Sequence, residues 1–264
     1  MTSRAEEPPA LFIVGTAGSG KTSLASSLTD WLNRRGISTE AVNLDPGADF
    51  LPYEPILDAR DFVNVYEVMG ERGLGPNSSL ILAADILADQ VDEMRKTLAD
   101  STADLFLVDT SGQIELFAFR SSGTYLAKEL FWGSKAIGFL VDAPFSIDPM
   151  NFLANMFLQS AVYSRLLLPL ITIVTKEDLV RSEDISRIFN WSRDRELLIS
   201  QAREEYPAQK FIHIESVLRS IPGLPFLSRP LVVSSNTLSG FTELYAEVSR
   251  LFFAGEETAT GPPH

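Results

Sequence analysis

The residues near the amino end of the chain have the types and spacing of a phosphate-binding loop. They read Gly15-Thr16-Ala17-Gly18-Ser19-Gly20-Lys21-Thr22. Glycines at these positions let backbone N–H groups turn toward phosphate oxygens, and the Lys21 ammonium can reach the β- and γ-phosphates. The Thr22 hydroxyl can ligate Mg²⁺. An apolar run (11–14) precedes the loop and a helical stretch (23–35) follows it. We therefore predict a nucleoside triphosphate site with phosphate contacts from Gly18, Ser19, Gly20, Lys21, Thr22 and Ser23.

A second group of candidate residues follows the apolar run 104–109 and reads Asp109-Thr110-Ser111-Gly112-Gln113. An acid at the tip of a buried strand, beside the phosphate loop, is where a carboxylate that organises Mg²⁺ belongs. The Gly112 N–H can approach the γ-phosphate, and the Gln113 amide can orient a water for in-line attack. Asp45, in Asn43-Leu44-Asp45-Pro46-Gly47, can approach both the metal and that water. A plain turn capped by Asp45 is the alternative.

Residues that could recognise the base follow two later apolar runs. The Asp178 carboxylate, in Thr175-Lys176-Glu177-Asp178, can accept hydrogen bonds from N1–H and N2–H₂ of guanine, and adenine lacks this donor pair. The Lys176 stem can lie over the base plane. Ser235, in Ser234-Ser235-Asn236, can offer a backbone N–H to the guanine oxygen. An ordinary charged loop is the alternative explanation for 175–178.

Composition limits the classes of function. The chain has 264 residues, 45% hydrophobic and 22% charged, which is typical of a globular domain. Its net charge of −13 argues against direct binding to nucleic acid or to an anionic membrane. Cysteine is absent, which excludes disulfides and thiolate metal sites, and two histidines, His213 and His264, are too few for a His-rich site. Because there is neither a signal-peptide pattern nor a membrane-length apolar run, we expect a cytoplasmic protein.

Apolar runs alternate with helical patterns along most of the chain. The expected strands are 11–15, 38–44, 104–109, 136–142, 170–175 and 231–234, and the expected helices include 23–35, 80–98, 149–165 and 241–252. The strand runs show little polar alternation, which favours parallel strands buried on both faces. The sequence therefore predicts a doubly wound α/β fold, with a mainly parallel sheet, helices on both faces and ligands at the carboxyl ends of the strands.

We expect one domain over 11–253, a disordered amino end over 1–10 and a flexible tail over 254–264. Two segments with several prolines, at about 51–78 and 178–230, are interpreted as helical insertions in that domain. In the helix expected after the first of them, apolar residues are spaced alternately four and three apart. They are Leu80, Ala84, Leu87, Val91, Met94 and Leu98. This stripe favours packing on the sheet, and contact with a second subunit is the alternative.

Together these motifs resemble those of the GPN-loop GTPases, which are P-loop NTPases of the signal-recognition and nitrogenase-iron-protein class. The tripeptide that gives the family its name stands here as Gly75-Pro76-Asn77. Other matching pieces occur in the same order, over roughly 11–253, and include Asp58-Ala59-Arg60-Asp61 and the motifs that begin at Asn43, Asp109 and Thr175. Without cysteine and with a short tail, the chain is more similar to an archaeal homodimeric member than to a eukaryotic paralogue.

The resemblance implies a homodimer in which the Gly75-Pro76-Asn77 loop of one subunit reaches the nucleotide of the other, so that Asn77 acts in trans. It also implies a Mg²⁺-dependent GTPase that converts GTP to GDP as a molecular switch. The expected catalytic residues are Gln113, Asp45 and Asn77, and the metal-side residues are Thr22, Asp109 and Asp45. Gly112, Lys176, Asp178 and Ser235 complete the expected nucleotide contacts.

The chain departs from the family pattern at Thr175, where the guanine motif commonly has asparagine. A hydroxyl cannot supply both the donor and the acceptor of an amide, so GTP is favoured through Asp178 while ATP stays open. Two other functions fit the motifs: a nucleotide-gated interaction module whose 178–230 insertion grips a client, and an ATP-dependent kinase of the same fold. Assistance in assembling a protein complex is implied only by analogy with eukaryotic relatives.

Overall fold

The computed structural model describes residues 7–207, 211–212, 215–216, 218–219 and 230–253. These residues form a seven-stranded sheet in the order β3-β2-β4-β1-β5-β6-β7, in which every neighbouring pair is parallel. The strands are β1 (Ala10–Gly15), β2 (Thr39–Asn43), β3 (Leu57–Asp58), β4 (Leu105–Asp109), β5 (Lys135–Asp142), β6 (Leu170–Thr175) and β7 (Leu231–Val232). The predicted doubly wound parallel sheet is confirmed.

Helices connect the strands in the order that the apolar patterns predict. They are α1 (Lys21–Asn33), α2 (Val65–Arg72), α3 (Pro76–Asp89), α4 (Val91–Ala99), α5 (Ser121–Glu129), α6 (Ala143–Ser146), α7 (Pro149–Leu166), α8 (Ser182–Arg193), α9 (Arg195–Glu205) and α11 (Phe241–Phe253). The start of α7 shows the local logic: the Asp148 carboxylate accepts from the N–H groups of Met150 and Asn151, each at 2.9 Å. Pro149 then occupies the first helical position, where its missing N–H costs nothing.

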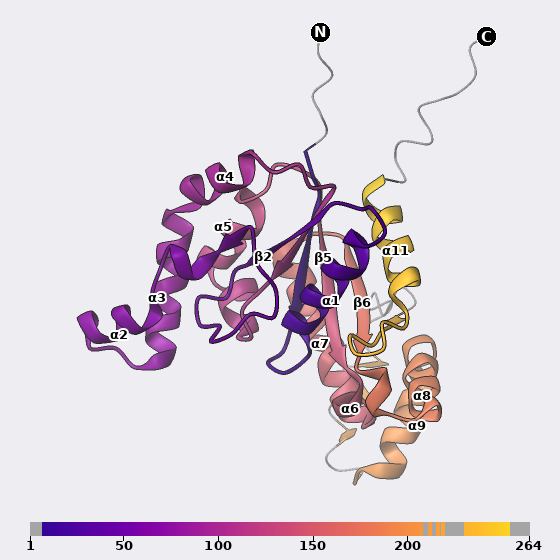
Figure 1. The fold of residues 1–264 in the computed structure, drawn as a ribbon. Helices are drawn as coiled ribbons and strands as arrows, with labels where there is room; N and C mark the ends of the chain where they lie inside the picture. Colours follow the sequence, from indigo (N-terminus) through magenta and orange to yellow (C-terminus); the bar gives the residue numbers. More distant parts are fainter. Residues whose placement is uncertain (1–6, 208–210, 213–214, 217, 220–229, 254–264) are drawn as a thin grey trace, which may run out of the picture.

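Alternate residues of β1 face opposite helical layers. Phe12 and Val14 belong to an apolar cluster with α3, α4, α5 and α7, whereas Leu11 and Ile13 pack against α1 and α11 (Figure 1). All residues from 10 to 14 are 0% exposed. A strand covered on both faces needs apolar side chains at every position, which explains why the sequence shows no polar alternation here.

The apolar stripe over 80–98 packs in the hydrophobic core, but it lies on two helices and not on one. Leu87, Met94 and Leu98 are buried in the cluster on the α3 and α4 face, as the sequence predicts. The prediction of one continuous helix is wrong. Gln90 lies between the end of α3 and the start of α4, and its backbone (φ −100°, ψ 11°) is not helical. The Gln90 side chain donates to the Phe62 carbonyl at 3.2 Å, which holds this break against the preceding segment.

The two expected insertions contain regular structure. Residues 51–78 include β3, a 3₁₀ turn at Ala59–Asp61, α2 and the first turn of α3. In the described part of 178–230, α8 and α9 lie at the β6 side of the molecule, near α6 (Figure 1). β1 begins one residue inside the segment expected to be disordered, and the tail 254–264, His213 and His264 lie outside the described residues. Of the helices in the described ranges, none is long and apolar enough to cross a bilayer.

One glycine of α5 is required by packing. A Cβ at Gly123 would lie 2.3 Å from the carbonyl oxygens of Leu116 and Phe117, in the π-helical segment Glu115–Phe119. We expect Gly123→Ala to lower the free energy of unfolding by about 2–3 kcal/mol, because backbone atoms must move. Urea unfolding checks this value. Gly70→Ala in α2, where nothing lies within 4 Å, is the matched control; its expected gain is about 0.5–1 kcal/mol. Equal effects of the two changes would contradict the prediction.

Candidate nucleotide-binding site

The loop between β1 and α1 has the backbone shape that phosphate binding needs. Gly18 (φ 77°) and Gly20 (φ 93°) adopt left-handed conformations that side chains rarely allow. Gly20 caps α1 without a side-chain hydrogen bond, so the first amides of the helix keep their donors for a ligand. Amides at a helix start, together with the helix dipole, favour an anion. The predicted phosphate loop is therefore present in shape.

Lys21 lies inside this loop. Its side chain is buried, and its ammonium donates to the carbonyl oxygens of Gly15 at 3.0 Å and Thr16 at 2.9 Å. Burial lowers the pKa of Lys21, while the nearby carboxylates of Asp109 and Asp45 act in the opposite direction. The ammonium is thus held between the loop carbonyls and two acids, where it can turn toward phosphate oxygens.

Asp109 ends β4 at the same edge of the sheet. The register sets it beside Ile13 of β1 and Asn43 of β2, and its side chain is 1% exposed. Burial raises the pKa of Asp109 to about 6, although hydrogen bonds from Thr22 and Tyr53 and the charge of Lys21 oppose the rise. The Tyr53 hydroxyl donates to Oδ2 at 3.1 Å.

The donor set around Asp109 fits Mg²⁺. Asp109 Oδ1 is buried and has no hydrogen-bond partner within the described part of the chain. The Thr22 hydroxyl lies beside the same carboxylate. Mg²⁺ prefers such oxygen ligands and takes only one or two from the protein, with phosphates and waters completing its shell. No group of three or more His, Cys, Asp or Glu in the described ranges could enclose a metal ion.

Asp45 joins the two loops that follow β2 and β4. Its Oδ1 accepts from the Gly47 N–H at 3.0 Å, and its Oδ2 accepts from the Gly112 N–H at 3.3 Å. The Asx turn expected as the plain alternative therefore exists, but the same carboxylate also contacts the segment that carries Gln113. The Gly112 N–H, predicted to face the γ-phosphate, is directed at Asp45 in this structure.

Gln113 and Asn77 are neighbours within one chain. The Gln113 side-chain amide donates to Asn77 Oδ1 at 3.4 Å, and both residues are exposed. Asn77 occupies the first turn of α3, directly after Pro76. The tripeptide loop and the expected water-positioning glutamine thus meet at the surface of the site.

The base-side motif is attached to the phosphate loop. The Thr175 hydroxyl donates to the Ser19 carbonyl at 2.8 Å, and the Lys176 ammonium donates to the Gly18 carbonyl at 2.6 Å. Lys176 also pairs with Asp142 at 2.8 Å. Thr175 therefore keeps a contact to the loop although it lacks an amide.

Asp178 faces the loop after β7. It accepts from the Ser234 hydroxyl at 2.6 Å and from the Asn236 amide at 3.0 Å, and these bonds lower its pKa, so the carboxylate is ionised at neutral pH. The half-buried Ser235, predicted to face the base, lies between these two partners in sequence. Ser23 is exposed on α1 and its carbonyl accepts from the Ser27 hydroxyl at 2.7 Å; its contact with phosphate stays a prediction.

Comparisons with known proteins agree with this geometry. A family model described as "conserved hypothetical ATP binding protein" matches residues 13–253. GPN-loop GTPase 1 of Schizosaccharomyces pombe is 34% identical over 69% of this chain and 51% of its own length. GPN-loop GTPase 3 of Xenopus tropicalis is 29% identical over 79% of this chain and 75% of its own length. The chain belongs to the GPN-loop GTPase family. It spans about half the length of some of these relatives.

A solved structure extends the likeness to three dimensions. The crystal structure of a GTPase in apo form from Pyrococcus abyssi superposes with a TM-score of 0.80 at 29% identity. The match covers 92% of this chain and 97% of that one. The parallel sheet and the helices on both of its faces are therefore shared with a solved GTPase structure.

Sequence reasoning missed two residues that contact the candidate site, Tyr53 and Asp142. Tyr53 contacts Asp109 from a loop 56 positions earlier, and Asp142 at the end of β5 pairs with Lys176 34 positions later. An acid at the end of an apolar strand run is a usable signal, and it was available for Asp142. Nothing local marks Tyr53, because its contact depends on how the loop after β2 folds back over α1.

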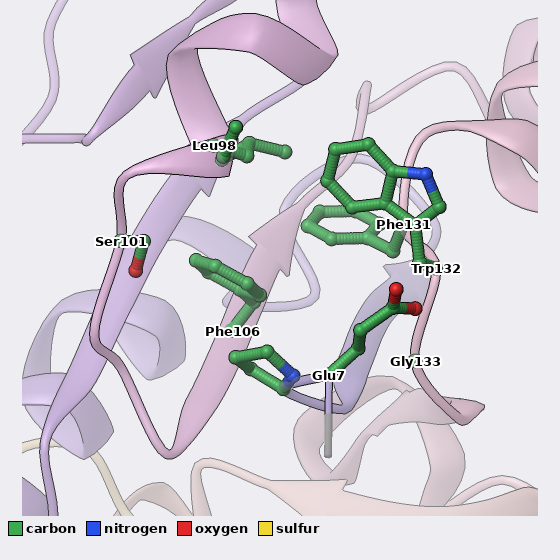
Figure 2. Close-up of a pocket in the computed structure, with 9 residues that line it drawn as sticks. Glu7, Leu98, Ser101, Phe106, Phe131, Trp132 and Gly133 are labelled. Atoms are coloured by element: carbon green, nitrogen blue, oxygen red, sulfur yellow. The ribbon is translucent and has the colours of Figure 1, made fainter. Parts of the chain in front are cut away.

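A separate hollow lies at the opposite end of the sheet. Figure 2 shows five of the residues that line it, which are Phe106, Phe131, Trp132, Glu7 and Ser101. Its volume is about 270 Å³. It opens at the amino ends of β1, β4 and β5, whereas Lys21 and Asp109 lie at the carboxyl ends. This hollow is therefore separate from the candidate nucleotide-binding site.

Proposed function

We propose that this protein is a Mg²⁺-dependent GTPase. The observation that carries the proposal is the meeting of buried Lys21 and buried Asp109 at the phosphate loop, with Gln113 at its rim. The names of the similar proteins support the same activity. GDP would be the product, released after the γ-phosphate is lost.

The proposed reaction needs positioning more than covalent chemistry. Water attacks the γ-phosphorus, the bond to the β–γ bridging oxygen breaks, and GDP leaves with its electron pair. Lys21 and the amides at the start of α1 neutralise phosphate charge, and Gln113 and Asp45 orient the water. Thr22 and Asp109 would hold Mg²⁺, which supplies further charge neutralisation when bound. Because the loop 15–22 contains no arginine, we expect slow turnover, roughly 10⁻⁴–10⁻² per second.

We further propose a homodimer in which Asn77 acts in trans as part of the switch. Asn77 and Pro76 are exposed, and the bond from Gln113 to Asn77 is long at 3.4 Å, so this loop is accessible to a second subunit. A role in assembling a protein complex belongs to the same proposal and rests on analogy. Mass measurement without nucleotide, with GDP and with a GTP analogue tests dimer formation in each state.

Guanine recognition is tested by Asp178→Asn. We expect wild-type protein to prefer GTP over ATP, and the variant to lose GTP affinity about 30- to 100-fold, because an amide cannot accept from both N1–H and N2–H₂. Xanthosine triphosphate should then bind the variant better than GTP, since its carbonyl at position 2 accepts from the amide that the variant carries at position 178. Calorimetric titration with the three nucleotides and Mg²⁺ measures this order.

Glu183→Gln, which removes an exposed acid at the start of α8, is the matched control and should leave all three affinities unchanged. Equal wild-type affinity for GTP and ATP would disprove guanine selectivity. Absence of binding to either nucleotide would disprove the proposed function itself.

A further inference from the structure

The Tyr53 hydroxyl makes a buried contact with the proposed metal carboxylate. It donates to Asp109 Oδ2 at 3.1 Å, while Asp109 Oδ1 is buried and without a partner in the described residues. The two oxygens of one carboxylate are therefore distinguished: Oδ2 accepts from Tyr53, and Oδ1 has no hydrogen-bond partner in the described residues, although the Thr22 hydroxyl lies beside the carboxylate. The contact joins residues 56 positions apart in the chain.

Tyr53 is itself held in place from several sides. Its ring packs against the apolar cluster that contains Trp31 of α1. The carbonyl of the preceding Pro52 accepts from the Ser26 hydroxyl of α1 at 3.2 Å. Ser26 lies on the helix that begins with Lys21, and the same helix contributes Trp31 to the cluster, so α1 links the segment around the phenol to the phosphate loop.

The loop before Tyr53 is fixed by an ion-pair network at its other end. Arg60 pairs with Asp58 at 2.6 Å and donates to the Ala48 carbonyl at 3.1 Å. The Asn43 amide donates to the same Asp58 carboxylate at 2.8 Å. The segment between β2 and β3 is therefore tied down on both sides of Tyr53, which limits where its hydroxyl can lie.

From this geometry we propose that Tyr53 is a positioning residue that fixes the Asp109 carboxylate so that its free oxygen faces the Mg²⁺ shell. The inference rests on the proposed function, because it assigns Asp109 to the metal side of the site. A hydrogen bond to one oxygen stops rotation of the carboxylate about its Cβ–Cγ bond. Donors that orient the ligands of a metal in this way typically contribute 10- to 100-fold in metal affinity or activity.

The phenol suits this role because it stays a donor. A phenol has an ordinary pKa of about 10, so the hydroxyl keeps its proton at neutral pH. It can then donate to Asp109 in all nucleotide states that preserve the loop. A serine or water at this place would lack the ring contacts that hold the hydroxyl still.

Tyr53→Phe separates positioning from packing, because it removes the hydroxyl and keeps the ring. The probe is ribose-labelled fluorescent GDP on the full chain, with its dissociation rate followed as Mg²⁺ is titrated from EDTA to millimolar concentration. We expect the Mg²⁺ concentration for half-maximal slowing to rise about tenfold in the variant. Nucleotide affinity in EDTA should stay within about twofold of wild type, since the hydroxyl that is removed donates to the Asp109 carboxylate.

Tyr66→Phe is the matched control. The Tyr66 hydroxyl also donates to a carboxylate, Asp49 Oδ1 at 2.9 Å, but Tyr66 is 71% exposed on α2. Its Mg²⁺ titration should overlay that of wild type. Overlay of the Tyr53→Phe curve with the wild-type curve would overturn the proposal.

Two further outcomes distinguish failure of this proposal from failure of the proposed function on which it rests. Wild-type protein that binds GDP with no response to Mg²⁺ refutes the proposed metal dependence, and with it the role of Asp109. If Tyr53→Phe unfolds, Ser26→Ala takes its place, because it frees the Pro52 carbonyl without touching the phenol. The Mg²⁺ concentration for half-maximal slowing should then rise about two- to fivefold, less than when the donor itself is removed. If this concentration does not change, the proposal is overturned.

Discussion

Replacing Gln113 with leucine is expected to slow GTP hydrolysis at least about a hundredfold while GTP affinity stays within about threefold. Leucine has a similar volume but cannot orient a water. The Gln113 side chain is exposed and donates only a long bond to Asn77 among the described residues, so its loss should leave the fold intact. Single-turnover phosphate release with saturating protein, together with calorimetric GTP binding, measures the two quantities separately.

Paired variants test whether Asn77 acts in the same chain or across a dimer. Asn77→Ala and Gln113→Leu should each be inactive alone. If Asn77 acts in trans, a mixed dimer holds one doubly defective and one intact site, so an equal mixture should recover about a quarter of wild-type activity. If Asn77 acts within its own chain, the mixture stays inactive. Parental hydrolysis by Gln113→Leu would refute the assignment of Gln113.

The phosphate loop could be predicted from sequence because its shape is decided locally. Gly18 and Gly20 permit the left-handed turns, the apolar run before them makes a buried strand, and Lys21 begins a helix. The acids at strand ends follow by the same reasoning, since all parallel strands end at one edge of the sheet. The charge of Asp45 accordingly acts on the pKa of Asp109.

The rest of the site depends on contacts between distant segments. Asp178 takes its hydrogen bonds from Ser234 and Asn236 and not from Ser235, which lies between them, because of how the chain turns after β7. Small polar residues show no sequence pattern that would predict this turn. The break at Gln90 is equally invisible, because an apolar stripe of the same spacing continues through it. β3 escapes prediction because two residues are too short to give a strand pattern.

Asp109→Asn is expected to stabilise the folded protein and abolish Mg²⁺-dependent hydrolysis. Burial raises the pKa of Asp109 from 3.8 to about 6, so holding it ionised at pH 7.5 costs the native state up to about 3 kcal/mol relative to the unfolded chain. Asparagine has nearly the same shape and no charge. We expect a gain of about 1–3 kcal/mol in the free energy of unfolding, measured by urea titration in EDTA without nucleotide. Hydrolysis should fall at least about a hundredfold, because asparagine binds Mg²⁺-bound water less strongly.

The pH dependence identifies the source of that gain. Between the unfolded pKa of 3.8 and the native value of about 6, the native state binds more protons than the unfolded state, so wild-type stability falls as pH rises through this window. The Asp109→Asn variant lacks this titration, and the difference between the two proteins should therefore grow from near zero at about pH 4 to its full value above about pH 7. Asp104→Asn, at an exposed acid whose carboxylate accepts from the Ser38 N–H at 2.9 Å, is the control. A gap between Asp109→Asn and wild type that is constant with pH would mean that repacking, and not relief of a buried charge, explains the gain. The charge of Asp109 would then lower the free energy of unfolding very little. The stability cost could no longer be used as an argument that the carboxylate is kept for function.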